Sequence, residues 1–161
     1  MLDMCTGSGC IIISLMKYQE GLLGTASDIS AEALEVAKEN AARQKVCIDF
    51  RQGNLFQNVE GRLDMIVSNP PYIPTDEITR LMEEVRCHEP IGALDGREDG
   101  LYFYRQITAK SLGYLNPGGW LLFEIGCDQG KSVAGLMESA GYRDIEVIKD
   151  LAGLDLSLIH I

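Results

Sequence analysis

The sequence has no excess of basic residues and no long, uniformly apolar run. It holds 14 Lys and Arg against 24 Asp and Glu, a formal net charge of −10, and no basic cluster longer than a pair such as Arg43 and Lys45. Nucleic-acid phosphates demand basic surfaces, so this composition disfavours such partners. No stretch is apolar over the length that spans a bilayer, and no signal peptide precedes the first apolar segment. We therefore expect a cytoplasmic protein without direct nucleic-acid or membrane contact.

Metal-ligating side chains are also scarce. The chain has only two histidines, and its five cysteines are an odd number without any Cys-x-x-Cys pair. Zinc sites need closely spaced Cys or His ligands, so we expect no metal site. The cysteines are expected to be reduced and to fill core or loop positions of an intracellular protein. They are Cys5, Cys10, Cys47, Cys87 and Cys127.

The N-terminal segment has the pattern of a strand, a glycine loop and a helix. An apolar stub from Leu2 precedes the small-residue loop 5–9, and the helix is predicted to run through Tyr18. Because glycine lacks a Cβ, the backbone at Gly7 and Gly9 can approach a ligand closely. The loop lacks both the Gly-Lys-Ser/Thr ending of a triphosphate-binding loop and the third glycine of a dinucleotide fingerprint. Nucleoside triphosphates and NAD are therefore disfavoured as ligands.

A second predicted strand, Leu22–Ser27, ends at Asp28. Ser30 can cap the following helix, which we place at Ala31–Gln44. Ligands of open α/β sheets bind at the carboxyl ends of the strands, and an acidic residue about twenty positions after a glycine loop is placed to accept hydrogen bonds from ribose hydroxyls. The alternative is that Asp28 is an ordinary helix-entry residue.

The remaining predicted strands and helices alternate along the chain. They are strands 48–52 and 63–68, helix 101–112, strand 120–125, helix 131–140 and strand 145–149, with a turn at 116–119 before strand 120–125. Such alternation predicts an α/β fold with a mostly parallel sheet, right-handed crossovers and helices on both faces. At 161 residues, without a linker or repeat, the chain is expected to form one domain.

The Asn-Pro-Pro-Tyr turn at residues 69–72 is the most informative motif. It directly follows the apolar run Met65–Ser68, and proline neither continues a strand ladder nor lets its neighbour start a helix. The Asn69 side-chain carbonyl and the Pro70 backbone carbonyl can each accept one hydrogen from a planar –NH2 group, while Tyr72 packs on its plane. The turn therefore suits an amide or an exocyclic amine, unless it only ends a strand.

These features together resemble the HemK/PrmC family, the protein-(glutamine-N5) methyltransferases of peptide-chain release factors, which are class I S-adenosyl-L-methionine-dependent methyltransferases. The resemblance covers residues 2–155 and includes the acidic residue at the tip of the first strand, followed by Gly-x-Gly. The further matching motifs are Asn69–Pro74, His88–Pro90, Ala93–Gly96, Asp99–Leu101, and Phe123–Gly126 followed by Gln129. The resemblance implies a Rossmann-like fold, S-adenosyl-L-methionine as cofactor, a release-factor glutamine as substrate, and a monomer.

The resemblance also implies the site residues. Cys5 stands where related methyltransferases usually have glycine, and its Cβ restricts the backbone dihedral angles that this position can adopt. The implied cofactor-binding residues are Cys5, Thr6, Gly7, Ser8, Gly9, Asp28, Asn54, Leu55 and Asn69, with Asp28 on the ribose and Asn54 and Leu55 beside the adenine. The glutamine amide would be held by Asn69, Pro70, Pro71 and Tyr72, of which Asn69, Pro70 and Tyr72 would be catalytic.

The resemblance places the methyltransferase domain at residues 1–155. The helical region that precedes this domain in the family has no counterpart here, and the last antiparallel strand, after strand 145–149, is expected to be missing. Residues 156–161 resemble a translated sequencing-adapter end and are expected to be a non-native tail. We therefore expect a domain truncated at both ends.

Two other functions stay open at this point. The same tetrapeptide serves methyltransferases of other planar nitrogens, in a ribosomal-protein glutamine or in an exocyclic amine of DNA or RNA. A nucleic-acid substrate would require a base to be extruded and a basic surface, which the acidic composition disfavours. The second alternative is that this chain, as a truncated domain, is an inactive cofactor-binding fragment.

Overall fold

The computed structural model describes residues 1–83, 89–151, 153 and 155–160. The chain divides into two compact units: a first unit of residues 1–69 and 111–122, and a second unit of residues 70–110 and 123–161. Asn69 is thus the last residue of one segment of the first unit, and Pro70 begins the second unit. Two residues singled out in the sequence, Cys87 and His88, lie outside the described residues.

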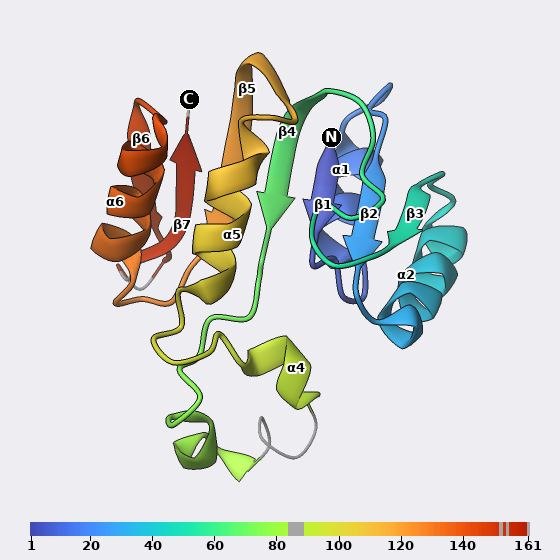
Figure 1. Cartoon of the computed structure of the whole chain (residues 1–161). Helices are drawn as coiled ribbons and strands as arrows, with labels where there is room; N and C mark the ends of the chain where they lie inside the picture. Colours follow the sequence, from blue (N-terminus) through green and yellow to red (C-terminus); the bar gives the residue numbers. More distant parts are fainter. Residues whose placement is uncertain (84–88, 152, 154, 161) are drawn as a thin grey trace. The chain divides into compact units, whose positions relative to one another are not determined.

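Among the described residues, five strands build the sheet of the first unit, in the order β3-β2-β1-β4-β5. Their bounds are β1 Leu2–Met4, β2 Thr25–Asp28, β3 Asp49–Gln52, β4 Leu63–Ser68 and β5 Leu115–Glu124, of which 115–122 belong to this unit. β1 pairs in parallel with β2 and with β4, and β2 pairs in parallel with β3. The arrows of β1, β2 and β4 point the same way in Figure 1. The predicted α/β fold with a mostly parallel sheet is confirmed.

Two helices follow the first two strands of this unit. They are α1 Cys10–Tyr18 and α2 Ala31–Gln44, as predicted. Ser30 caps α2, because its Oγ accepts a hydrogen bond from the Ala33 N–H at 3.1 Å. Lys45 ends α2 in the left-handed region, at φ 59°. The core that joins α1, β2 and α2 consists of Ile12, Ile13, Ala26 and Ala41.

An aromatic pair anchors the loop that follows β3. Phe56 is buried, and its ring stacks on that of Tyr114 with the centroids 4.5 Å apart. The Leu63 N–H at the start of β4 donates to the Tyr114 carbonyl at 2.8 Å. This packing fixes the loop that carries Asn54 and Leu55.

The second unit contains the 3-10 helix η1 Ile78–Arg80, the helices α4 Ile91–Leu94 and α6 Gly130–Ala140, and residues 102–110 of the helix α5 Tyr102–Ser111. Its strands are β6 Ile145–Lys149 and β7 Asp155–His160. β6 and β7 pair antiparallel. Gly141 ends α6 at φ 101°, a conformation that glycine adopts without strain. The core of this unit includes Tyr104, Ile107, Val133 and Met137.

Three predictions about strands are wrong. Residues 155–160 form β7, so the strand expected to be missing after β6 is present. Strand pairing uses main-chain N–H and C=O groups, which most residue types can offer to an open strand edge. β5 begins at Leu115 rather than Trp120 and includes the predicted turn, where Gly118 has φ 77°. β2 begins at Thr25 rather than Leu22, and the side chain of Leu23 is exposed.

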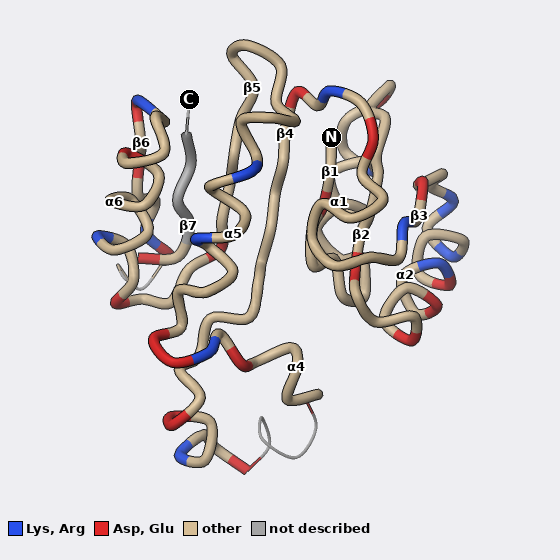
Figure 2. The backbone as a smooth tube through the Cα atoms, in the orientation of Figure 1, with Lys and Arg blue, Asp and Glu red and all other residues tan. Residues whose placement is uncertain are grey.

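Charged residues of both signs are distributed along α2, as Figure 2 shows. Lys38 pairs with Glu35 at 2.7 Å and Arg43 pairs with Glu39 at 3.3 Å. Exposed pairs of this kind contribute less than about 1 kcal/mol each. In the part of the chain that the structure describes, no helix combines the length and the apolar character needed to cross a bilayer.

Candidate functional site

Four parallel strands of the first unit end at one edge of its sheet. Met4, the last residue of β1, is level with Ser27 of β2 and with Ser68 of β4. The Ser68 Oγ donates to the Met4 carbonyl at 2.8 Å and ties the two strand ends together. Cys5 and Asn69 therefore follow directly from neighbouring strand ends. The sheet brings together the glycine loop and the first residue of the Asn-Pro-Pro-Tyr turn.

The glycine loop after β1 is held by backbone and side-chain hydrogen bonds. The Thr6 N–H donates to the Ser27 carbonyl at 3.0 Å, and the Gly9 N–H donates to the Thr6 carbonyl at 2.9 Å. Gly9 has φ 79°, and a Cβ there would lie 3.1 Å from the Ala37 Cβ. Gly7 has φ 55°, but a Cβ there would meet no atom within 4 Å. Gly9 thus permits close packing of α1 on α2, whereas Gly7 leaves open space beside the loop.

Cys5 occupies the left-handed region, at φ 58°. A residue with a Cβ costs roughly 1–2 kcal/mol in this conformation, which explains the usual glycine at this position. Burial raises the pKa of the Cys5 thiol to about 12, and the negative charge of Asp28 contributes. The thiol is therefore protonated at neutral pH, so this cysteine is no nucleophile.

Asp28 has a fixed carboxylate at the end of β2. Its Oδ2 accepts the Gly7 N–H and its Oδ1 accepts the Ser30 N–H, each at 2.9 Å. Ser30 caps α2, and the bond from its N–H to the Asp28 carboxylate is a helix-entry contact, so the helix-entry alternative for Asp28 stays open beside the ribose role. Each carboxylate oxygen keeps further acceptor capacity, which a pair of ribose hydroxyls can use.

Asn54 and Leu55 follow β3 in the loop beside Asp28. The Gly53 N–H donates to the Asp28 carbonyl at 2.9 Å, which joins this loop to the end of β2. Leu55 has φ 52°, an uncommon value for a residue with a Cβ. The structure thus places both predicted residues at the same sheet edge, and their contact with an adenine stays a prediction.

Asp3 is a site residue that the sequence analysis did not include among its candidates. It is completely buried; its Oδ2 accepts the Thr6 hydroxyl at 2.6 Å and the Ile12 N–H at 3.3 Å. Its Oδ1 is buried without a hydrogen-bond partner among the described residues. Burial raises the pKa of Asp3 to about 6, although the bonds from Thr6 and Ile12 oppose the rise. The signal in the sequence was an acidic residue in the apolar segment that leads into the Gly-x-Gly loop.

The residues at this edge fit S-adenosyl-L-methionine. Open space lies beside Gly7. Asp28 offers acceptors for ribose hydroxyls, and the unpaired buried oxygen of Asp3 offers negative charge to a cationic ligand. In the described part of the chain, no group of three His, Cys, Asp or Glu side chains is arranged to hold a metal ion.

The rest of the turn, from Pro70 to Tyr72, lies in the second unit. The Gln129 side-chain amide donates from Nε2 to the Tyr72 carbonyl at 2.9 Å. Burial raises the pKa of the Tyr72 hydroxyl, with contributions from Glu124 and Cys127, so the hydroxyl is protonated at neutral pH. The tyrosine therefore has a neutral ring system and a fixed backbone.

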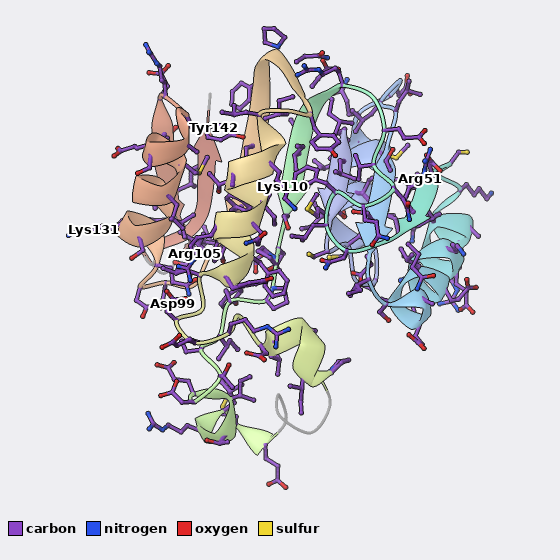
Figure 3. All side chains as sticks on the ribbon, in the orientation of Figure 1. Arg51, Asp99, Arg105, Lys110, Lys131 and Tyr142 are labelled. Carbon is purple, nitrogen blue, oxygen red and sulfur yellow. The ribbon has the colours of Figure 1, made fainter. Side chains whose placement is uncertain are left out.

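The charged loop 95–99 is ordered by hydrogen bonds and an ion pair. Asp95 accepts the Thr75 hydroxyl at 2.7 Å and the Arg97 N–H at 2.9 Å, and these bonds lower the pKa of Asp95. Arg105 donates two hydrogen bonds to the Asp99 carboxylate, at 2.8 and 2.9 Å; both residues are labelled in Figure 3. These contacts give the loop a defined path.

A cavity of about 510 Å³ lies within the second unit. Tyr72, Ile73 and Pro74 contribute to its wall. Its lining also includes the apolar residues Leu81, Leu101, Ile125 and Leu156 and the acidic residues Glu77, Asp99, Asp128, Asp150 and Asp155; among the described residues, no Lys, Arg or His lines it. The chemistry of this lining favours a ligand that is partly apolar and positively charged.

Known proteins resemble this chain over most of its length. The methyltransferase small domain family matches residues 1–86. The release factor glutamine methyltransferase of Cereibacter sphaeroides is 46% identical over 157 residues, which are 96% of this chain and 56% of that protein. The release factor glutamine methyltransferase of Clostridium acetobutylicum is 44% identical over 160 residues, 95% of this chain and 55% of that protein. The chain thus spans about half the length of the curated relatives that it matches.

A solved structure supports the fold. A methyltransferase from Pyrococcus furiosus superposes with a TM-score of 0.73 at 22% sequence identity, over 99% of this chain and 72% of that chain. The Rossmann-like methyltransferase fold predicted from the sequence is confirmed, and so is the family resemblance that the motifs indicated.

Proposed function

Because this chain belongs to the methyltransferase small domain family, we propose that it binds S-adenosyl-L-methionine and transfers a methyl group to a glutamine side-chain nitrogen of a peptide-chain release factor. The observation that carries the proposal is the sheet edge: Asn69 follows β4 next to the glycine loop that follows β1. The names of the relatives at 46% and 44% identity support the choice of substrate.

The first unit would hold the cofactor. Asp28 accepts the ribose hydroxyls, the loop 5–9 borders the ribose and methionine parts, and Asn54 and Leu55 border the adenine. Asp3 would offset the positive charge of the ligand, since its buried carboxylate has an oxygen without a hydrogen-bond partner among the described residues. When bound, S-adenosyl-L-methionine supplies an electrophilic methyl group on a sulfonium sulfur.

The Asn-Pro-Pro-Tyr turn would hold the acceptor amide. An amide nitrogen is a poor nucleophile because its lone pair is delocalised into the carbonyl. The Asn69 Oδ1 and the Pro70 carbonyl each accept one N–H hydrogen, which orients the nitrogen so that its lone pair points at the methyl group, and Pro71 and Tyr72 bound the plane of the amide. Bound S-adenosyl-L-methionine would supply the methyl group and leave as a neutral thioether, and the amide nitrogen held by Asn69 and Pro70 would release one proton to solvent. Positioning and electrostatics therefore lower the barrier without a general base.

Charge favours a protein substrate over a nucleic acid. The chain carries a net charge of −10, and the described residues that line the cavity beside Tyr72 include five acidic and no basic side chains. These carboxylates repel a phosphate backbone and attract a basic protein segment. All residues assigned to the reaction lie in residues 1–155 of one chain, so the proposal requires no oligomer. With a release factor as substrate, the proposed reaction takes place in the cytoplasm.

The Asn69→Ala substitution tests the proposal. Purified chain is incubated with a release factor and S-adenosyl-L-methionine, and mass spectrometry locates the added methyl group. We expect methylation of one glutamine, a loss of turnover on the order of 10²–10³-fold in the variant, and cofactor affinity by calorimetry close to that of the wild type. Asn116→Ala is the control, because it removes an asparagine of the first unit whose side chain bonds Asp64 at 2.7 Å.

Unchanged turnover in Asn69→Ala would contradict the assigned role of the turn. Methyl transfer to a DNA or RNA base, with none to the release factor, would contradict the assigned substrate. A release factor whose acceptor glutamine is replaced by glutamate serves as the substrate control, since it lacks the amide nitrogen.

A further inference from the structure

The backbone of Tyr72 is closely surrounded within the second unit. A Cβ at Gly96 would lie 2.8 Å from both the Tyr72 Cα and its carbonyl carbon. A Cβ at Gly100, which has φ 71°, would overlap the Tyr72 carbonyl oxygen. Real Cβ atoms do not approach backbone atoms this closely, so both positions require glycine as long as Tyr72 stays in place.

The side chain of Gln129 completes this enclosure. Its Nε2 donates to the Tyr72 carbonyl at 2.9 Å and lies 3.5 Å from the Gly100 carbonyl, at the limit of a hydrogen bond. Its Oε1 accepts the Gly126 N–H at 3.0 Å. The residue is only 8% exposed. One buried amide thus links the turn, the loop 95–100 and the segment before α6.

A short backbone ladder holds the residue after Tyr72. The Ile73 N–H donates to the Leu94 carbonyl at 3.0 Å, and the Gly96 N–H donates to the Ile73 carbonyl at 2.8 Å. The Thr75 N–H donates to the Arg97 carbonyl at 3.0 Å. The path of the turn is therefore set by the loop 94–97, and Gln129 is the side chain that locks the tyrosine itself against that loop.

We infer that Gln129 is a positioning residue that fixes the backbone of Tyr72, and through it the ring that bounds the acceptor amide. The inference rests on the proposed function for its effect on catalysis, but the enclosure itself stands on the contacts within the second unit. A shift of about 1 Å in a group that orients a reactant can cost on the order of 10²-fold in rate. Gln129 therefore acts on turnover and leaves cofactor binding unchanged.

The two ends of the Gln129 amide separate positioning from a purely structural role. The Oε1 accepts the Gly126 N–H in the segment before α6, while the Nε2 donates to the Tyr72 carbonyl. Gln129→Glu keeps the acceptor and adds negative charge at a helix N-terminus, which is favourable. Its second oxygen, however, faces the carbonyls of Tyr72 and Gly100 and repels them. A role limited to the bond with Gly126 predicts a fully active Gln129→Glu variant, whereas the positioning role predicts an impaired one.

The first experiment measures kcat and KM for Gln129→Glu, with Met137→Ala as the control. Met137 is a fully buried residue of α6, so its truncation destabilises the second unit without removing any Gln129 bond. We expect kcat to fall on the order of 10²-fold in Gln129→Glu, with KM for S-adenosyl-L-methionine unchanged. Met137→Ala should lower the unfolding temperature and keep kcat. Wild-type kcat in Gln129→Glu would overturn the inference.

Hydrogen exchange provides a readout that does not depend on activity. In Gln129→Met, which removes both side-chain bonds at similar volume, we expect faster exchange at the amides of Ile73, Thr75 and Gly96 and unchanged exchange in α2. Unchanged exchange at these three amides overturns the enclosure. If they exchange faster but the wild-type chain methylates no release factor, the proposed function fails and the role of Gln129 in fixing Tyr72 stands.

Discussion

Asp3→Asn tests how far the buried carboxylate of Asp3, in β1, lowers the free energy of unfolding. Asp3 is completely buried, its Oδ2 accepts from Thr6 and Ile12, and its Oδ1 has no partner among the described residues. Asparagine has the same shape and keeps one acceptor oxygen, but it carries no charge. The substitution therefore removes the burial of a charge and changes little else.

The size of the effect follows from the pKa of Asp3. Burial raises this pKa from 3.8 to about 6, and at about 1.36 kcal/mol per pKa unit the ionised form costs about 3 kcal/mol in the folded protein. Between these two pH values the folded state retains a proton that the unfolded chain has released, so stability falls as pH rises. Below pH 3.8 both states are protonated, and above the folded pKa the loss is complete.

The assay is urea unfolding of the wild type and Asp3→Asn at intervals from pH 4 to pH 8. The two free energies of unfolding should be similar near pH 4 and diverge as pH rises, until the variant is more stable by up to about 3 kcal/mol at neutral pH. Asp76→Asn, at an exposed aspartate, controls for the loss of one negative charge. Free energies that stay parallel across this pH range would refute the reasoning.

A ligand-binding measurement tests whether the destabilising charge of Asp3 contributes to cofactor binding. If the Asp3 carboxylate stabilises a cationic cofactor, Asp3→Asn should weaken binding of S-adenosyl-L-methionine in calorimetry. Binding of 5′-methylthioadenosine, which has the adenosine part without the sulfonium or the amino acid, should change little. Equal weakening of both ligands would indicate a distorted loop instead of a lost charge.

Two further predictions concern Asp28 and Gly100. Asp28→Ala removes the proposed ribose acceptor, and calorimetry should show cofactor affinity reduced about ten- to a hundredfold, since hydrogen bonds to a charged group contribute roughly 1.5–3 kcal/mol; retained affinity would exclude that role. Gly100→Ala places a Cβ against the Tyr72 carbonyl, whereas Gly118→Ala meets no atom within 4 Å at a similar φ. In thermal and chemical unfolding, Gly100→Ala should therefore lose roughly 1–3 kcal/mol more than Gly118→Ala, and equal losses would show that the contact with Tyr72 is unimportant.

Local signals predicted the elements of the first unit well. The bounds of α2 follow from the Ser30 cap and from a run of residues with high helix propensity, both of which act within a few positions. The start of β2 was predicted too early, because the apolar residues Leu22 and Leu23 resemble a strand although Leu23 is exposed. Propensity alone does not reveal which apolar residues the core will cover.

The sequence also predicted which residues lie at the strand ends better than it predicted the outer strands of the fold. Alternating strands and helices imply a parallel sheet, and a parallel sheet gathers its strand ends, so Asp28 and Asn69 were identified from position alone. The length of β5 and the presence of β7 were missed, since pairing depends on which strand edges are available in three dimensions.

By itself, the sequence determined the residue types at the strand ends, the order of strands and helices, and the family. Only the tertiary structure decided that Asp3 is buried with an unpaired oxygen, that Cys5 adopts a left-handed conformation, and that Gln129 fixes Tyr72. The physical reason is distance along the chain. Gln129 and Tyr72 are 57 positions apart, and no periodicity or local propensity encodes a contact that forms only when the chain has folded.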